Sequence, residues 1–277
     1  MLRMAAGELG RYATLDMLQS IHLNAGWLHR PPLPPASCHI LAVYARRDQV
    51  CLVDTGIGLR DIADPCNRIG SDSIDAAGFK LLPEWTAINQ LDVLGIPSSA
   101  VTDIILTHCD PDHVGGLDDF PNATVHLSDE EKRNVLSGNP RYATNQLSSI
   151  SNWRTYSKDD RSVLGLHARS LDLTMGAEVC LVPLFGHTHG HCGVAVRIDD
   201  SWLIHVGDAY YLREELHNKT HPISVLAAAR ADDDQLRLNS VDLIRSLSKR
   251  GGVEVSFFGY HDTTELPPQI PTPMELA

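Results

Sequence analysis

The sequence predicts a mixed α/β (α+β) fold in which two batches of strands are separated by helices. Short apolar runs bounded by Gly, Pro or Asp recur along the chain, which is typical of buried strands. Several runs end in a short loop that carries Gly together with His or Asp, at Asp54, 108–113, His187, Asp208 and His261. Strand ends that converge on one edge of a sheet can assemble a site from distant sequence, so the same pattern predicts where the site lies.

The bulk composition is that of an ordinary globular protein. The chain has 277 residues, of which 43% are hydrophobic and 21% charged, enough to bury a sizeable core without disulfides or structural metals. We expect one domain that spans residues 1–277. The net charge of −12 argues against a nucleic-acid partner held by phosphate contacts and against docking on an anionic membrane surface.

Cysteine usage and hydropathy predict a cytoplasmic location. None of the six cysteines forms a C-x-x-C pair, and most lie inside apolar runs, so we expect no disulfide framework. Residues 1–11 contain no apolar core of a signal peptide, and no stretch approaches 18 consecutive apolar residues, which disfavours secretion and membrane insertion.

In the first third of the chain, four prolines within 24–37 predict a stiff, non-helical loop. Strands are expected over 39–45 and 49–53, joined by a tight turn. Residues 57–83 contain scattered Gly and Pro and predict an irregular flap with a short helix. Apolar residues at helical spacing predict a helix over 84–94.

In the middle of the chain, strands are expected over 101–106 and 123–127. Ser128 followed by Glu131 is a capping box, which predicts a helix over 128–136.

The rest of the chain continues the pattern. Residues 138–165, rich in Ser and Asn, are expected to be an insertion with helical pieces. A strand over 178–185 and a hairpin over 194–206 follow. The last elements are an amphipathic helix over 239–250 and a strand over 253–258.

The densest group of metal-binding residue types lies in the loop after the strand 101–106. It contains His108, Asp110, Asp112 and His113. A loop at a strand end is rigid enough to hold a metal centre and open enough to admit a substrate. Asp54, in the sequence Asp-Thr-Gly, is open to two interpretations: a turn cap, or a residue that supports the site.

Taken in order, this loop together with His187, Asp208 and His261 resembles the metallo-β-lactamase superfamily, and the match extends over nearly the whole chain. The resemblance implies an αββα sandwich of two mixed β-sheets flanked by helices, with a dinuclear metal centre at one edge. The ligands to the first metal would be His108, Asp110 and His187; those to the second would be Asp112, His113 and His261; and Asp208 would bridge both, together with a hydroxide.

One position departs from the family pattern. Asp110 stands where most of the superfamily has His. The extra carboxylate makes the cluster less positive and the first site harder, which favours Mn or Fe more than an all-imidazole site does. Zinc remains the expected metal, and Asp110→His is expected to raise its occupancy. The alternative is that Asp110 supports a mononuclear site without binding metal.

Tyr211 follows Asp208 by three residues. In the N-acyl-homoserine-lactone lactonases of this superfamily, a Tyr at that offset points at the metals, so the resemblance implies that Tyr211 stabilises developing oxygen charge. The alternative is ordinary packing in a corner of the fold. His189 is expected to support the ligands or face the substrate, and Cys109 to point away from the metals. The acidic run 232–234 is expected to be a solvated face or a helix start.

These residues predict a metal-dependent hydrolase of the lactonase-like branch. The bridging hydroxide would attack a carbonyl carbon, and Asp112 would carry its proton to the leaving group. The expected substrate is a small-molecule ester, lactone or thioester that is neutral or weakly anionic.

Three alternatives remain open at this stage. The first is another hydrolase of the same fold, a glyoxalase II-like thioesterase or a phosphoesterase. The second is an iron-dependent oxidoreductase, because flavodiiron proteins also have a carboxylate at the position of Asp110. The third is a non-catalytic ligand-binding module. The oligomeric state is also open, a homodimer included.

Overall fold

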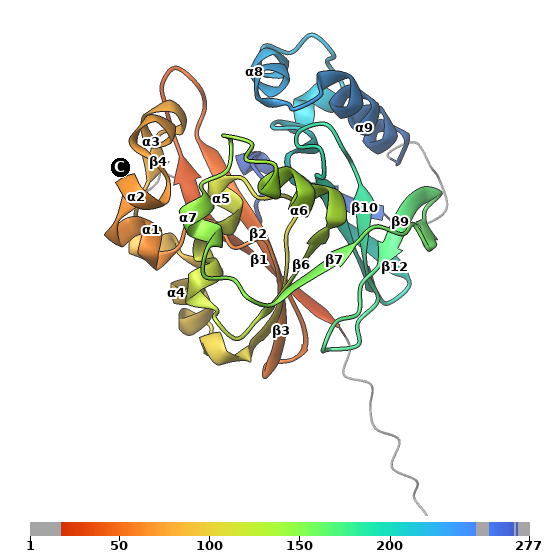
Figure 1. The fold of residues 1–277 in the computed structure, drawn as a ribbon. Coiled ribbons are helices and arrows are strands. Elements are labelled where there is room, and N and C mark those ends of the chain that lie inside the picture. Colours follow the sequence, from red (N-terminus) through yellow and green to blue (C-terminus); the bar gives the residue numbers. More distant parts are fainter. Residues whose placement is uncertain (1–17, 248–254, 269, 271–277) are drawn as a thin grey trace, which may run out of the picture.

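Two β-sheets pack face to face at the centre of the molecule, and helices cover their outer faces (Figure 1). The structure is a computed structural model, and it describes residues 18–247, 255–268 and 270. This arrangement is the αββα sandwich of two mixed sheets that the family resemblance implied, so the predicted fold class is confirmed.

The first sheet contains seven strands in the order β4-β1-β2-β3-β5-β6-β7. Their bounds are β1 Gln19–Leu28, β2 Ala36–Arg46, β3 Gln49–Val53, β4 Phe79–Lys80, β5 Val101–Ile105, β6 Thr124–Ser128 and β7 Trp153–Tyr156. Strands β3, β5, β6 and β7 pair in parallel. Their carboxyl ends therefore meet at one edge, where open α/β sheets usually place their ligands.

The second sheet contains six strands in the order β13-β12-β11-β10-β9-β8. Their bounds are β8 Arg161–Val163, β9 Leu166–Ser170, β10 Val179–Pro183, β11 Cys192–Ile198, β12 Ser201–His205 and β13 Val255–Phe258. Pairing is antiparallel except between β12 and β13, which are parallel. The ends of β12 and β13 consequently lie side by side.

Short helices connect and cover the strands in the part of the chain that is described. The α-helices are α1 Leu59–Ala63, α2 Pro65–Arg68, α3 Ser71–Ala77, α4 Ala87–Val93, α5 Pro111–Val114, α6 Asp129–Leu136, α7 Thr144–Leu147, α8 Ile223–Arg230 and α9 Asp234–Leu247. The 3₁₀ helices are η1 Pro83–Trp85, η2 Ser98–Ala100, η3 Gly115–Asp119, η4 Gly207–Ala209, η5 Arg213–Leu216 and η6 Thr263–Glu265.

The core has a layer on each side of both sheets. Between the sheets, Leu41 and Ile105 of the first sheet share one fully buried cluster with Leu181 and Val194 of the second. On the outer face of the second sheet, α9 buries an apolar stripe that includes Ile244. Burial of this kind contributes about 25 cal/mol per Å² of apolar surface and fixes how the two sheets sit on each other.

The predicted loop over 24–37 is wrong at both ends. Strand β1 runs as far as Leu28 and β2 begins at Ala36, so the connection is residues 29–35, which contain all four prolines. The prolines on which the prediction rested all lie in this connection. The segment before them has apolar residues at every second position, 21, 23, 25 and 27, as expected of a strand. Asn24 within it is fully buried and accepts a hydrogen bond from the backbone N–H of Cys38 at 2.9 Å, so its polar side chain is satisfied inside the sheet.

Two further segments differ from the prediction. Residues 57–83 contain three short helices and β4 instead of one helix in an irregular flap. Residues 138–165 contain only α7 as a helix, while β7 adds an edge strand to the first sheet. Ser128 caps α6 as predicted, since it accepts from the backbone N–H of Glu131 at 3.0 Å, but the reciprocal half of the capping box is not formed, because the Glu131 carboxylate accepts from the backbone N–H of Cys109 instead. The predicted features at 1–11, 248–250 and 253–254 lie outside the described residues.

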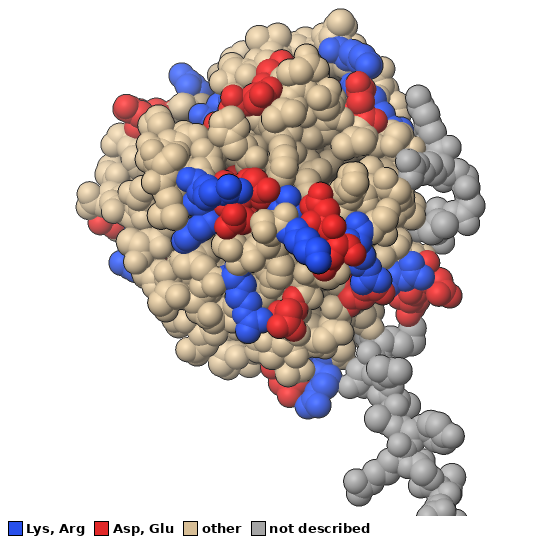
Figure 2. Space-filling model, turned by 45° about the vertical axis from the view of Figure 1, so that its right-hand side comes forward, with Lys and Arg blue, Asp and Glu red and all other residues tan. Residues whose placement is uncertain are grey.

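Charges on the face shown in Figure 2 are mixed, with basic groups beside acidic ones. Exposed ion pairs such as Arg46–Asp48 and Arg161–Glu178 are consistent with this mixture of charges. No helix in that part of the chain is long and apolar enough to cross a membrane.

A cluster of three histidines, His22, His39 and His205, lies between the sheets and adjoins the loop after β12 through His205. The Nδ1 atom of His22 is 2.8 Å from the Nε2 atom of His39. The backbone carbonyl of His39 accepts a hydrogen bond from His205 at 2.7 Å, and Phe258 packs against all three rings. Burial, followed by the nearby His205, lowers the pKa of His22 from 6.5 to about 4.

This lowered pKa predicts a pH-dependent stability. As the pH falls from 6.5 towards 4, the unfolded chain takes up a proton at His22 that the folded chain resists, so the free energy of unfolding decreases. His22→Gln preserves a hydrogen-bonding group and removes this titration. We expect the Tm of the wild type to fall more steeply over this range than that of the variant. The exposed His167→Gln serves as the control, and equal slopes in all three proteins would contradict the prediction.

Candidate metal centre and its pocket

The strand-end loops of both sheets meet at one edge of the sandwich. The first sheet contributes Asp54 after β3 and residues 107–113 after β5. The second sheet contributes His187 after β10, Asp208 after β12 and His261 after β13. All of these His and Asp side chains are buried, so the site spans the junction of the two sheets.

The first group of candidate ligands surrounds a space of the size of one metal ion. The Oδ2 atom of Asp110 is 3.6 Å from the Nε2 atom of His108 and 3.3 Å from that of His187. The Oδ2 atom of Asp208 is 4.0 Å and 3.5 Å from the same two nitrogens. A tetrahedral ion with bonds of about 2.0–2.1 Å separates its ligand atoms by about 3.4 Å, so these distances fit.

A second group adjoins the first. The Oδ2 atom of Asp112 is 3.9 Å from the Nε2 atom of His113 and 3.6 Å from that of His261. Asp208 approaches the same two nitrogens, with Oδ1 at 3.4 Å from His113 and Oδ2 at 3.1 Å from His261. Asp208 therefore faces both groups.

The side-chain atoms that face these spaces fit divalent metal ions. Within the described residues, the buried Nε2 atoms of His108 and His113 and the Oδ1 atom of Asp208 have no hydrogen-bond partner. Buried polar atoms without a partner are costly unless a ligand satisfies them. Imidazole nitrogens together with carboxylate oxygens suit zinc, manganese or iron.

Asp54 supports the site through the other face of His113. Its Oδ2 atom is 2.9 Å from the Nδ1 atom of His113, and its carboxylate also accepts from the backbone N–H and the hydroxyl of Thr107, both at 2.8 Å. Asp54 adopts a φ of 59°, which is uncommon for a residue with a side chain. A carboxylate behind an imidazole fixes which nitrogen faces a metal.

His191 supports Asp208 in a similar way. Its Nδ1–H donates to the carbonyl of Leu184 at 2.8 Å, and its Nε2 atom accepts from the backbone N–H of Asp208 at 3.0 Å. Burial, followed by the neighbouring His187, lowers the pKa of His191 to about 3. The ring is therefore neutral, as an acceptor at Nε2 requires.

Asp110 is held by an arginine that the sequence did not single out. Arg141 donates from Nε to Oδ1 and from a terminal nitrogen to Oδ2, both at 2.7 Å. The other terminal nitrogen of Arg141 donates to Asp232 at 2.9 Å and to the carbonyl of His187 at 2.7 Å. Burial opposes ionisation of Asp110, but the Arg141 charge outweighs it and holds the pKa of Asp110 well below its usual range.

The bidentate contact between Arg141 and Asp110 changes the charge of the site. A guanidinium beside Asp110 returns the positive charge that the extra carboxylate removes, and each Asp110 oxygen retains a free lone pair. The charge count from the sequence included Asp110 without Arg141. The acidic run 232–234 was expected to be a solvated face or a helix start, and α9 does begin at Asp234. Asp232 is not part of a solvated face, because it accepts hydrogen bonds from Arg141, Asn134 and the backbone N–H of His189. A separation of 31 residues between Asp110 and Arg141 leaves no local pattern that would reveal the pair.

Glu131 links the loop after β5 to the loop after β10 through hydrogen bonds. Its fully buried carboxylate accepts from the backbone N–H of Cys109 at 2.8 Å and from the hydroxyls of Tyr142 and Thr188 at 2.9 and 2.5 Å. Burial raises the pKa of Glu131 to about 7. The Cys109 side chain packs in the core on the outer side of the first sheet, pointing away from the candidate ligands. The His189 side chain is exposed and is not among those that line the pocket.

Tyr211 lies against both groups of candidate ligands. Its ring centroid is 5.8 Å from that of His187 and 5.3 Å from that of His261, edge to face in both cases. Burial raises the pKa of the Tyr211 hydroxyl well above its usual value, so the group remains a hydrogen-bond donor near neutral pH.

The centre opens into a pocket of about 580 Å³. Asp110, Asp112, Asp208, Tyr211 and His261 form its polar end. The walls are largely apolar and come from the segments around 28–36, 72–79 and 211–230. Such a pocket, apolar with a few convergent polar groups, is typical of small-molecule sites.

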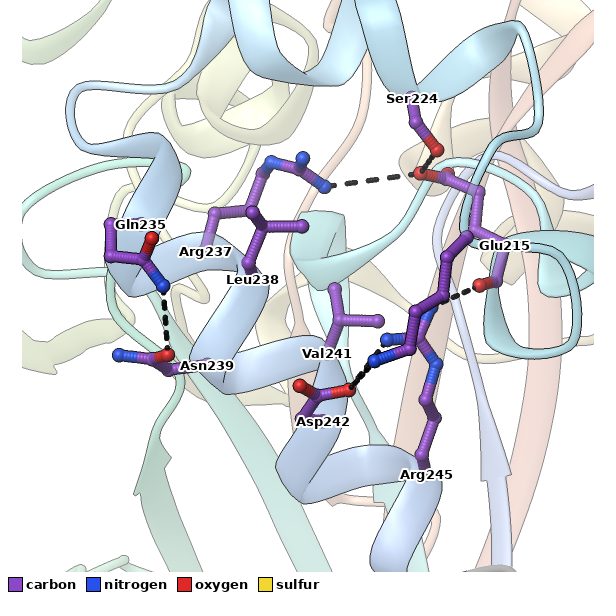
Figure 3. Close-up of a pocket in the computed structure, with 10 residues that line it drawn as sticks. Glu215, Ser224, Gln235, Arg237, Leu238, Asn239, Val241, Asp242 and Arg245 are labelled. Atoms are coloured by element: carbon purple, nitrogen blue, oxygen red, sulfur yellow. Dashed lines mark hydrogen bonds and ion pairs between the residues drawn. The ribbon is translucent and has the colours of Figure 1, made fainter.

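A second cavity of about 290 Å³ lies between η5, α8 and α9 (Figure 3). Glu215 at its wall accepts from the backbone N–H groups of Tyr211 and Leu212 through Oε1 and from the hydroxyl of Ser224 through Oε2, at 2.8, 3.2 and 2.9 Å. Arg237 pairs with the same carboxylate at 3.8 Å. Glu215 thus ties Tyr211 to α8, and both contribute to the wall of the metal-site pocket.

Comparison with known proteins gives a family. The model of the metallo-beta-lactamase superfamily matches residues 33–250. Two proteins described as probable metallo-hydrolases, from Mycobacterium bovis and Mycobacterium tuberculosis, are each 34% identical over 251 residues. The aligned region covers 87% of this chain and 79% of each relative.

Solved structures with the same fold include lactone hydrolases. An N-acyl homoserine lactone hydrolase, with the product N-hexanoyl-L-homoserine at its catalytic metal centre, has a TM-score of 0.67 at 19% identity and covers 91% of this chain and 95% of its own. A dizinc quorum-quenching lactonase has a TM-score of 0.62 at 17% identity, with coverage of 91% and 90%. At these identities the likeness shows the fold alone.

The bidentate Asp110–Arg141 contact predicts a large coupling energy between substitutions at these two positions. Asp110→Asn and Arg141→Met should each lower the free energy of unfolding of the metal-free protein by about 3 kcal/mol, because the first leaves the buried Arg141 with Asp232 as its one remaining close carboxylate and the second leaves the Asp110 carboxylate without its bidentate partner. The double variant should lose less than the two single losses together, by about 1–3 kcal/mol. Urea denaturation after chelator dialysis measures this. The matched control is the exposed pair Arg46–Asp48, where we expect a coupling below about 1 kcal/mol; equal couplings in the two pairs would contradict the prediction.

Proposed function

The chain belongs to the metallo-β-lactamase superfamily, and from that premise we propose that this hydrolase opens lactones or cleaves closely related esters with an apolar acyl group. The observation that carries the proposal is the position of Tyr211, which lies between His187 and His261 at the polar end of an apolar pocket. A phenol that remains protonated beside a metal centre is suited to donate to a departing oxygen.

We propose that seven residues hold two divalent ions, His108, Asp110 and His187 on one and Asp112, His113 and His261 on the other, with Asp208 shared. The ligand distances and the unpartnered imidazole nitrogens support this assignment. Divalent ions bound there supply Lewis acidity and an activated water. Zinc is the proposed metal, because Arg141 offsets the charge of Asp110 and leaves the centre with the charge balance of a His-type site.

The protein groups then have distinct roles. Asp112 lines the pocket and is partly exposed, with 12% of its side chain accessible. Its carboxylate is therefore placed to take a proton from the attacking water and return it to the leaving group. Tyr211 donates its hydroxyl proton in a hydrogen bond to the oxygen on which charge develops. Asp54 and His191 act on the ligands only, by fixing the orientation of His113 and Asp208.

The lining of the pocket favours an acyl compound over a polyanion as the substrate. Leu28, Leu33, Phe79, Ile223 and Leu226 are among its walls, and they would exclude water from an alkyl chain. Neutral alkyl groups gain free energy on entering such walls, whereas a polyanion would place several charges against a lining with few cations.

Removal of the shared carboxylate tests the metal centre. Because Asp208 faces both groups of ligands, Asp208→Ala should lose both ions and all hydrolysis. Metal content measured by elemental analysis, on protein purified without added metal, gives the result. His167→Ala, which changes an exposed histidine, should keep both ions. Two tightly held ions in Asp208→Ala would contradict the assignment.

The substrate class is tested at Tyr211. Tyr211→Phe should keep the metals and lower kcat on lactones by about ten- to a hundredfold, since one donor to the developing oxygen charge is lost. A panel of a lactone, a thioester and a phosphodiester identifies the class. The neighbouring Tyr210 donates to Glu265 instead, so Tyr210→Phe is the matched control and should keep kcat. If Tyr211→Phe equals the wild type on every substrate, the lactonase proposal fails.

A further inference from the structure

Helix α8 presents a mixed stripe to the pocket. Ile223, Leu226 and Arg230 all line it, and positions spaced by three and four residues lie on one face of a helix. The helix is anchored by the hydrogen bond from Ser224 to Glu215. Two apolar residues are followed along the helix by a cation, so α8 lines one part of the pocket with apolar side chains and another part with a positive charge.

Arg230 lies at the metal end of this stripe. A terminal nitrogen of its guanidinium is 3.6 Å from the Oδ2 atom of Asp110, too long for a hydrogen bond. Both Asp110 oxygens are already bound by Arg141 at 2.7 Å. About half of the Arg230 side chain is exposed. Its charge is therefore only weakly compensated and remains available to a ligand in the pocket.

The other charged groups of the pocket wall do not occupy the same position. Arg141 is used by Asp110 and Asp232. Arg30 donates to the carbonyl of Ala76, and Asp72 belongs to α3, across the pocket from α8. Among the described residues that line the pocket, Arg141 and Arg230 are the cations within 4 Å of a candidate ligand, and of these two only Arg141 donates hydrogen bonds to it.

We propose that the substrate carries a carboxylate close to the bond that is cleaved, that Arg230 binds this carboxylate, and that the apolar chain runs along Leu226 and Ile223. This inference rests on the proposed function, since it assigns the substrate class of the same site. In a protein with a net charge of −12, an anionic substrate needs a local cation to enter. A planar guanidinium with free N–H groups matches a carboxylate in shape and charge.

Binding of a matched pair of probes tests the proposal. N-octanoylglycine and N-octanoylglycinamide differ only in the carboxylate, and calorimetry on the metal-loaded protein gives both Kd values. The wild type should bind the acid about tenfold more tightly than the amide, a difference of about 1.4 kcal/mol. Arg230→Met should abolish this preference by weakening the acid alone, and Arg230→Lys should retain part of it.

Two controls make the result specific. Arg154→Met removes an equally exposed arginine outside the pocket and should leave the preference unchanged. If Arg230→Met keeps the full preference, the carboxylate binds elsewhere, for example at the metals, and the proposal is overturned. An equal affinity of the wild type for both probes overturns it as well.

Turnover separates this inference from the proposed function. The ratio of kcat/KM values for a lactone with a free carboxylate and for its neutral amide should be about ten in the wild type, by the same difference in binding energy, and near one in Arg230→Met. Hydrolysis of both lactones without discrimination would support the proposed function and overturn the role of Arg230. Discrimination in binding with no turnover of any ester would overturn the proposed function and support the Arg230 subsite.

Discussion

The shared position of Asp208 between two groups of imidazoles is the constraint on which the site depends. Each group combines a histidine from the loop after β5 in the first sheet with a histidine from a loop that follows β10 or β13 in the second. A single carboxylate lies within 4.0 Å of His108 and 3.4 Å of His113 only if the sheets keep their relative position. The apolar layer between the sheets therefore sets the geometry of the site as well as the stability of the fold.

The charge of the site is balanced by groups that bind no metal. Asp54 lies behind His113, and Arg141 lies behind Asp110. These two contacts act in opposite directions, since the carboxylate increases the basicity of an imidazole and the guanidinium reduces the charge of a carboxylate. A count of charges over the candidate ligands alone therefore gives the wrong charge for the centre.

Much of this arrangement was predictable from the sequence, and the exceptions have physical reasons. Apolar runs that end in Gly, His or Asp revealed most strands and, through the family resemblance, the positions of all seven candidate ligands. The prolines at 31–35 led the predicted loop to begin at 24, inside β1, although residues 21–27 alternate as in a strand. The sequence also did not reveal Arg141, Arg230 or the contacts of Glu131, because a contact or pocket wall formed across a long separation depends on the packing of whole elements and leaves no periodic trace.

The bidentate Asp110–Arg141 contact also limits how this protein can change over time. A codon change that restores His at 110 leaves Arg141 buried beside an imidazole, and a change at 141 alone leaves a buried carboxylate without its partner. A protein with either single change is expected to be less stable than one that has both original residues and one in which both have been exchanged. The two positions should therefore be exchanged as a unit in descent, and relatives that have His at the first position are expected to lack Arg at the second.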